Sequence, residues 1–152
     1  MLANLVLASV MVSTTVVFHF WGLIGLTWLL RGSSAHLRPH KNRRRQASLI
    51  LLVVFGIFAL HTVEIWLYAA LFNSLGEAGD FEAALYFATI TFVSLGSGDV
   101  LLSDHWRLVG AIEAANGVIL LGWSTAFLIS VTSRLKLLEH EWLEDPVAAE
   151  VL

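Results

Sequence analysis

The residues best suited to chemistry lie between Thr89 and Asp99, where the sequence reads TITFVSLGSGD. Backbone carbonyl oxygens can replace the water around a dehydrated cation without the full negative charge that would trap it. Pointing successive carbonyls the same way requires backbone angles that most L-residues resist and that Gly96 and Gly98 adopt readily. The pattern therefore predicts a cation-binding strip of backbone over residues 94–98.

Each residue of this strip has an expected role. Asp99 would lie at the outer mouth and raise the local concentration of cations. Because one strip cannot surround an ion, this interpretation requires an oligomer with closed cyclic symmetry. The ion would be bound by the Ser94 hydroxyl and by the carbonyls of Ser94, Leu95, Gly96 and Ser97, with Gly98 closing the outer end.

The same segment also fits the Gly-x-Gly-Asp pattern of intramembrane aspartyl proteases. Those enzymes need a second membrane-embedded aspartate for acid–base catalysis. The other aspartates are Asp80, Asp104 and Asp145, which fall in predicted loops or in the tail. We therefore expect this protein not to be an enzyme.

The composition is that of a membrane protein. Of the 152 residues, 57% are hydrophobic and 14% are charged, whereas soluble domains average about 25% charged residues. The net charge of -3 provides no basic surface for nucleic acid, and the chain has no cysteine for disulfides or thiolate metal sites. We expect no cofactor, and no metal ion other than the permeant cation, K⁺ or alternatively Na⁺, in the strip.

Three apolar stretches are long enough to cross a bilayer, which takes about 20 residues. A fourth, over 81–92, is too short to cross and predicts a re-entrant helix that Asp80 caps. The expected organisation is an additional N-terminal transmembrane helix over 1–30, a basic loop over 31–47, a pore domain over 48–133 and a short tail over 134–152. Within the pore domain we expect an outer helix over 48–72, a pore helix over 81–92, a filter over 94–99 and an inner helix over 107–133.

The distribution of charge predicts the orientation. Six of the nine Lys and Arg residues lie between Arg31 and Arg45, and residues 73–106 contain none. The positive-inside rule places the basic loop and the C-terminus in the cytoplasm, and the N-terminus outside. We expect a multi-pass protein of the cell membrane, with Trp66, Tyr68 and Trp106 as anchors at its outer interface.

Polar residues interrupt the second and third apolar stretches. His61 and Glu64 are three residues apart, as are Glu113 and Asn116, so each pair shares one helix face. Ionisable groups within a membrane are costly and usually face the interior of a helix bundle. We therefore expect both acids to be buried, whereas His19 in the first stretch has no evident partner.

Two interpretations of the buried acids stay open. In the first, Glu64 or Glu113 is a structural polar group, hydrogen bonded to Thr89, to Thr91 or to the backbone of the short helix. In the second, one of the two acids braces the filter and titrates, which would make ion conduction depend on pH. Thr89 and Thr91 are expected to support the filter from the pore helix.

Residues 94–99 resemble the pore loop of the potassium-channel family, whose usual form is Thr-Val-Gly-Tyr-Gly-Asp. Trp106-Arg107-Leu108 is similar to the start of that family's inner helix, and the chain looks like a small bacterial channel with an additional N-terminal helix. The resemblance covers roughly residues 48–134. It implies a hinge at Gly117 and Gly122, although these glycines alternatively permit close helix packing, and a cavity lined by Val118, Leu121 and Thr125.

The resemblance implies an all-α homotetramer that conducts potassium passively through a selectivity filter. Ser97 stands where the family has tyrosine, so aromatic packing behind the filter is missing, and a non-selective monovalent cation channel is an alternative. A non-conducting structural or regulatory membrane subunit is another. The expected partners are further copies of the chain, membrane lipid and permeant monovalent cations, while a separate regulatory subunit stays unidentified.

Overall fold

The computed structural model describes residues 1–34, 43–96 and 102–135. Several expected features therefore lie outside the described residues. They are Ser97, Gly98 and Asp99, residues 35–42 of the basic loop, and the tail beyond residue 135.

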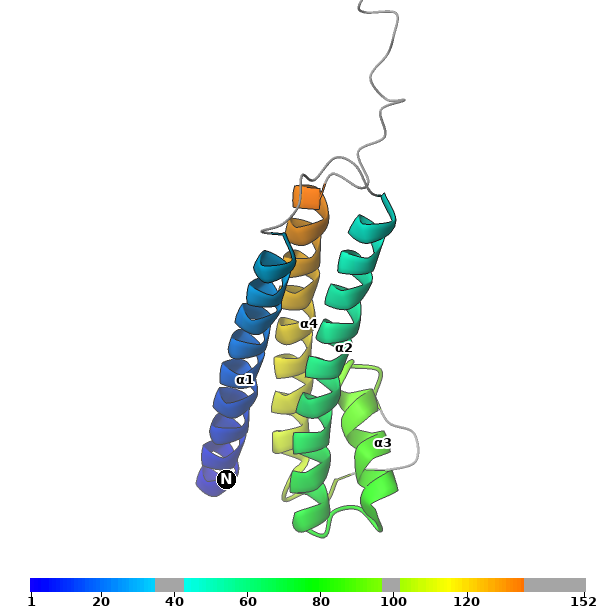
Figure 1. The fold of residues 1–152 in the computed structure, drawn as a ribbon. Coiled ribbons are helices and arrows are strands. Elements are labelled where there is room, and N and C mark those ends of the chain that lie inside the picture. The colour runs from blue at the N-terminus through cyan, green and yellow to red at the C-terminus, as the bar shows by residue number, and fades with distance from the viewer. Residues whose placement is uncertain (35–42, 97–101, 136–152) are drawn as a thin grey trace, which may run out of the picture.

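Most of the described residues are helical, and no strand occurs among them, so the expected all-α fold is confirmed. Figure 1 shows the long helices lying side by side, with the short helix at the end of the bundle that carries the N-terminus. In chain order the helices are α1 (Leu2–Ser34), α2 (Arg43–Ser74), α3 (Phe81–Phe92) and α4 (Arg107–Leu135).

The three long helices can each cross a membrane by their length and composition. Their apolar spans are Leu2–Gly32, Gln46–Ser74 and Arg107–Arg134. At 1.5 Å per residue, the shortest span of 28 residues is about 42 Å long, which exceeds the hydrocarbon core of about 30 Å. The chain is therefore a multi-pass membrane protein.

The short helix α3 begins as the sequence predicts. Asp80 has extended backbone angles, and its Oδ1 accepts a hydrogen bond of 2.8 Å from the backbone N–H of Ala83. Glu82 lies in the first turn, where a negative charge favours the helix dipole. The expected N-cap at Asp80 is thus confirmed.

The apolar core lies where α3 packs between α2 and α4. Phe72 and Phe87 meet edge to face with ring centroids 5.3 Å apart. Small side chains beside these rings let the helices approach closely. The buried cluster consists of Ala8, Tyr68, Ala69, Phe72, Ala84, Phe87, Ala88 and Val109.

Polar bonds attach α1 to the other helices. The Asn116 side-chain amide donates to Thr15 Oγ1 at 2.8 Å and to the Tyr68 hydroxyl at 3.2 Å, which joins α4, α1 and α2. Near the N-terminus, the Asn4 amide donates to the carbonyl of His105. The prediction of Tyr68 as an interfacial anchor is wrong, because its ring is buried and its hydroxyl accepts from Asn116.

Replacing Asn116 by alanine tests whether this junction holds the three helices together. Asn116→Ala leaves the hydroxyls of Thr15 and Tyr68 without their donor, at an expected cost of about 1–3 kcal/mol. We expect a lower melting temperature of the solubilised protein. The control is Thr62→Val, because the exposed Thr62 hydroxyl bonds within its own helix, to the Phe58 carbonyl at 2.8 Å. Equal melting temperatures for the two variants would contradict the assignment.

Candidate functional site

The site begins at the C-terminal end of α3, where backbone N–H groups of the following residues cap the helix. The Ser94 N–H donates to the Thr91 carbonyl at 2.8 Å, and the Leu95 N–H donates to the Ile90 carbonyl at 2.9 Å. This pair of bonds is a Schellman motif, in which the residue after the cap takes left-handed backbone angles. Ser94 has that role with φ 57°, the one positive φ of a non-glycine residue in the described ranges.

Gly96 continues the irregular backbone with φ 80°. A Cβ atom at this position would meet no atom within 4 Å, so the backbone angle, and not lack of space, favours glycine here. The sequence predicted this need at Gly96 but not the left-handed angle of Ser94. Leu95 between them is 77% exposed in the single chain.

The irregular backbone starts well away from the end of the bundle, measured along the axis of α4. Gly117 of α4 contacts the carbonyl of Phe92, the last residue of α3, and lies ten residues beyond Arg107 at the start of α4. At 1.5 Å per residue this is about 15 Å along the helix, half the thickness of a hydrocarbon core. Non-helical backbone at such depth must be covered by protein or line a water-filled path.

Electrostatics at this point favour a cation. The C-terminal end of α3 carries the negative end of the helix dipole. Ser94 lies directly after this end and bonds to its last turn. The Ser94 hydroxyl donates to the Ala114 carbonyl of α4 over 3.4 Å, and its oxygen keeps lone pairs for a further partner. The backbone after α3 thus combines exposed polar groups with a negative helix end.

The two threonines of α3 have different surroundings. Thr89 is exposed and donates to the Leu85 carbonyl of its own helix at 2.7 Å. Thr91 borders a hollow of about 350 Å³, together with Ser94 and Gly96. The support of the filter by these threonines stays a prediction, with Thr91 the better placed of the two.

The two glycines of α4 also differ. A Cβ atom at Gly117 would overlap the Phe92 carbonyl, so this glycine permits close packing of α4 against the end of α3. A Cβ atom at Gly122 would meet nothing within 4 Å of the chain. The packing alternative therefore accounts for Gly117, whereas a hinge at Gly122 stays a prediction.

The expected cavity residues share one face of α4. Val118 is 54% exposed, Thr125 is exposed, and Leu121 is partly buried. Their spacing of three and four residues places them along one side of the helix. Asn116, Gly117 and other buried residues occupy the face against α1, α2 and α3.

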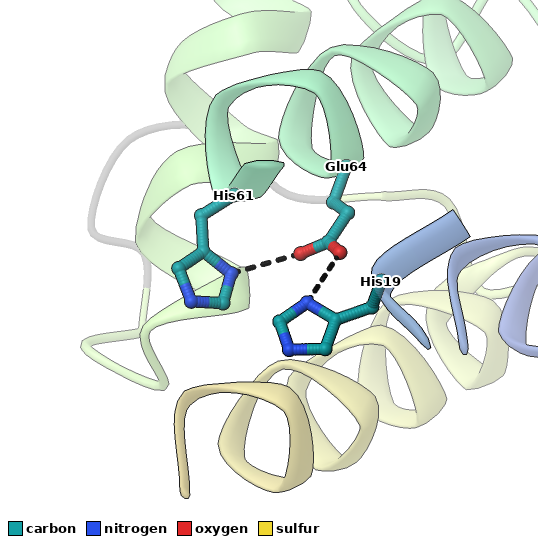
Figure 2. Close-up of side chains that lie close together, drawn as sticks. All are labelled: His19, His61 and Glu64. Atoms are coloured by element: carbon teal, nitrogen blue, oxygen red, sulfur yellow. Dashed lines mark hydrogen bonds and ion pairs between the residues drawn. The ribbon is translucent and has the colours of Figure 1, made fainter. Parts of the chain in front are cut away.

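Glu64 bonds to two histidines instead of to α3. Its Oε1 lies 2.8 Å from His19 Nδ1, and its Oε2 lies 2.8 Å from His61 Nδ1 (Figure 2). The expected hydrogen bonds from Glu64 to Thr89, Thr91 or the α3 backbone are not found among the described residues. Glu64 is linked to α3 indirectly, through His61, whose ring centroid lies 5.6 Å from the ring centroid of Phe92.

Glu113 is buried on α4, next to the residue whose carbonyl accepts from Ser94. Within the described part of the chain, neither carboxylate oxygen of Glu113 has a hydrogen-bond partner. A buried carboxylate without partners is costly. Its expected hydrogen bond to α3 is therefore not found, and its role in bracing the filter stays a prediction.

Sequence reasoning missed the partners of His19. Its Nδ1 meets Glu64, and its Nε2 lies 3.3 Å from the Ser124 hydroxyl. The one available signal was an ionisable residue inside an apolar span, which predicts a buried partner without naming it.

Comparison with known proteins agrees with this geometry. Residues 47–134 match the family model described as "Ion channel", which is more than half of the chain. The whole of α1 precedes the matched region. No curated protein and no solved structure matches the chain.

A matched pair of glycine variants tests the close approach of α4 to α3. In Gly117→Ala the added methyl group meets the Phe92 backbone, which cannot rotate away, and we expect a loss of roughly 1–3 kcal/mol in stability. Gly122→Ala gains helix propensity in open space and should melt at or slightly above the wild-type temperature. Thermal unfolding of the solubilised proteins measures both, and a Gly117→Ala variant as stable as Gly122→Ala would refute the contact.

Proposed function

Because the chain belongs to the ion-channel family, we propose that it assembles as a homotetramer and conducts potassium passively across the cell membrane. The ion would pass through a filter of backbone carbonyls that replace its hydration shell. The filter residues are Ser94, Leu95, Gly96, Ser97 and Gly98, with Asp99 at the outer mouth.

One observation carries this proposal. Directly after α3 the backbone leaves the helical conformation, with left-handed angles at Ser94 and Gly96, at a depth where irregular backbone needs protein or water around it. In the single chain Ser94, Leu95 and Gly96 are exposed. Further copies around a water-filled axis would provide the cover that one chain lacks.

The arrangement of the helices supports a cyclic assembly. One strip supplies oxygens on one side of an ion, so several strips must face a common axis. The face of α4 that carries Val118, Leu121 and Thr125 is turned away from the buried face of the helix, and we assign it to the cavity below the filter. The C-termini would then lie in the cytoplasm with the basic loop.

A non-selective monovalent cation channel is the second candidate, and one feature of the sequence favours it. The residue between the two filter glycines is Ser97, a small hydroxyl residue. An aromatic side chain there would add apolar contacts that hold the strip in place. With serine, the spacing of the carbonyls has less lateral support, which weakens discrimination between potassium and sodium.

Flux measurements on a matched glycine pair test conduction through this backbone. In Gly96→Ala, a residue with a Cβ atom must adopt left-handed backbone angles, which costs roughly 1–2 kcal/mol per chain. The same cost applies in every copy around the pore. We expect potassium flux into proteoliposomes to fall at least about tenfold. Gly79→Ala is the control, because Gly79 has no positive φ and no atom near its Cβ position. Equal flux in the two variants would contradict the filter assignment.

Recordings of the wild-type protein under opposing potassium and sodium gradients separate the candidate functions. A reversal potential close to that of potassium is expected for the selective channel. A reversal potential near zero would replace it with the non-selective one. A purified tetramer that is silent across varied voltage and pH would instead indicate a non-conducting subunit.

A further inference from the structure

A second polar site, made of none of the strip residues, lies between α1, α2 and α4. It consists of His19 from α1 with His61 and Glu64 from α2, and Figure 2 shows both imidazole rings turned toward the one carboxylate. The side chains of His19 and Glu64 are fully buried, and His61 is 9% exposed. Neither the match to the ion-channel family nor the proposed conduction path accounts for this cluster.

The charge of Glu64 requires a partner. Isolated buried carboxylates are strongly disfavoured. No Lys or Arg occurs before Arg31, between Arg45 and Arg107, or between Arg107 and Arg134, so the middle of every long helix lacks a basic side chain. When Glu64 is ionised, the compensating positive charge comes from protons on the histidines or from an added cation.

The donor set suits a divalent transition metal. Two imidazole nitrogens and one carboxylate oxygen form a three-ligand set used for zinc and for related first-row metals. The three ligand atoms lie within 4.8 Å of one another. Tetrahedral zinc with bonds of about 2.0–2.2 Å needs ligands roughly 3.4 Å apart, so modest side-chain rotations bring the set into range.

The surroundings of the two rings support ligation. The Ser124 hydroxyl lies 3.3 Å from His19 Nε2, where it can accept the N–H of a histidine that binds metal through Nδ1. The Nε2 atom of His61 is buried and has no hydrogen-bond partner within the described residues. Because no hydrogen bond holds this nitrogen, the His61 ring can turn toward an ion shared with His19 and Glu64 without breaking a bond at Nε2.

Aromatic rings enclose the cluster. The ring centroids of Trp123 and His19 are 5.4 Å apart, and those of Phe92 and His61 are 5.6 Å apart. A shell of this kind limits the access of water, which strengthens the attraction between a cation and the carboxylate. Because Phe92 ends α3, an ion here would lie directly behind the start of the irregular strip.

We propose that His19, His61 and Glu64 bind a divalent transition-metal ion of the zinc class. The ion ties α1 to the outer helix α2 and thereby fixes the additional helix to the channel domain. This assignment extends the sequence expectation, which placed metal ions at the strip alone, and it does not depend on conduction.

Metal content of the full-length protein, purified without a histidine tag, tests the proposal. After loading with Zn²⁺ and removal of free metal, elemental analysis of the wild-type protein should find about one zinc per chain. His61→Gln and Glu64→Gln should each lower this value at least about tenfold. The matched control is His105→Gln, because His105 is exposed and lies outside the cluster; it should keep the wild-type content.

A second control removes the histidines of the remaining segments. The combined substitution of His36, His40 and His140 by glutamine should leave the zinc content unchanged. Wild-type protein without stoichiometric zinc, or zinc that persists in both His19→Gln and His61→Gln, would overturn the site.

Spectroscopy of the wild-type protein avoids dependence on variants that fail to fold. X-ray absorption of the zinc-loaded protein should report two imidazole ligands and oxygen at about 2.0–2.1 Å. A first shell of oxygen alone would overturn the proposal. Neither measurement requires ion flux, so a silent channel and an absent metal site are distinguishable results.

Discussion

Polar groups inside an apolar helix bundle must find partners, and this constraint organises the whole protein. At the end of α3 the amides of Ser94 and Leu95 bond back to the last turn of the helix. The backbone that follows stays exposed in the single chain, at a depth where lipid cannot satisfy it. A single copy is therefore an incomplete membrane structure, which is the physical reason for proposing a ring of copies around water.

The same constraint explains how α1 is attached. This helix lies entirely before the region that matches the ion-channel family, yet Thr15 and His19 bond to side chains of the matched region. Apolar surface gives little specificity between helices in lipid, because the lipid tails are equally apolar. Buried hydrogen bonds to Asn116 and Glu64 therefore specify where α1 docks.

Much of the fold could be predicted because the relevant signals are local. Hydropathy over about 20 residues indicates each span, and Asp80 marks the start of α3 through a bond to a residue three positions later. The left-handed angle at Gly96 could also be anticipated, since glycine adopts it at little cost. The angle of Ser94 could not, because it arises from two bonds that close the preceding helix.

The sequence by itself determined the membrane class, the number of spans, the short capped helix and the position of the glycine-rich strip, since each depends on neighbours along the chain. The tertiary structure decided which polar side chains meet: Glu64 with His19, Asn116 with Tyr68, and Gly117 with the end of α3. Those pairs join different helices. Their identity depends on how the helices are rotated and shifted against one another, which no local pattern of residues specifies.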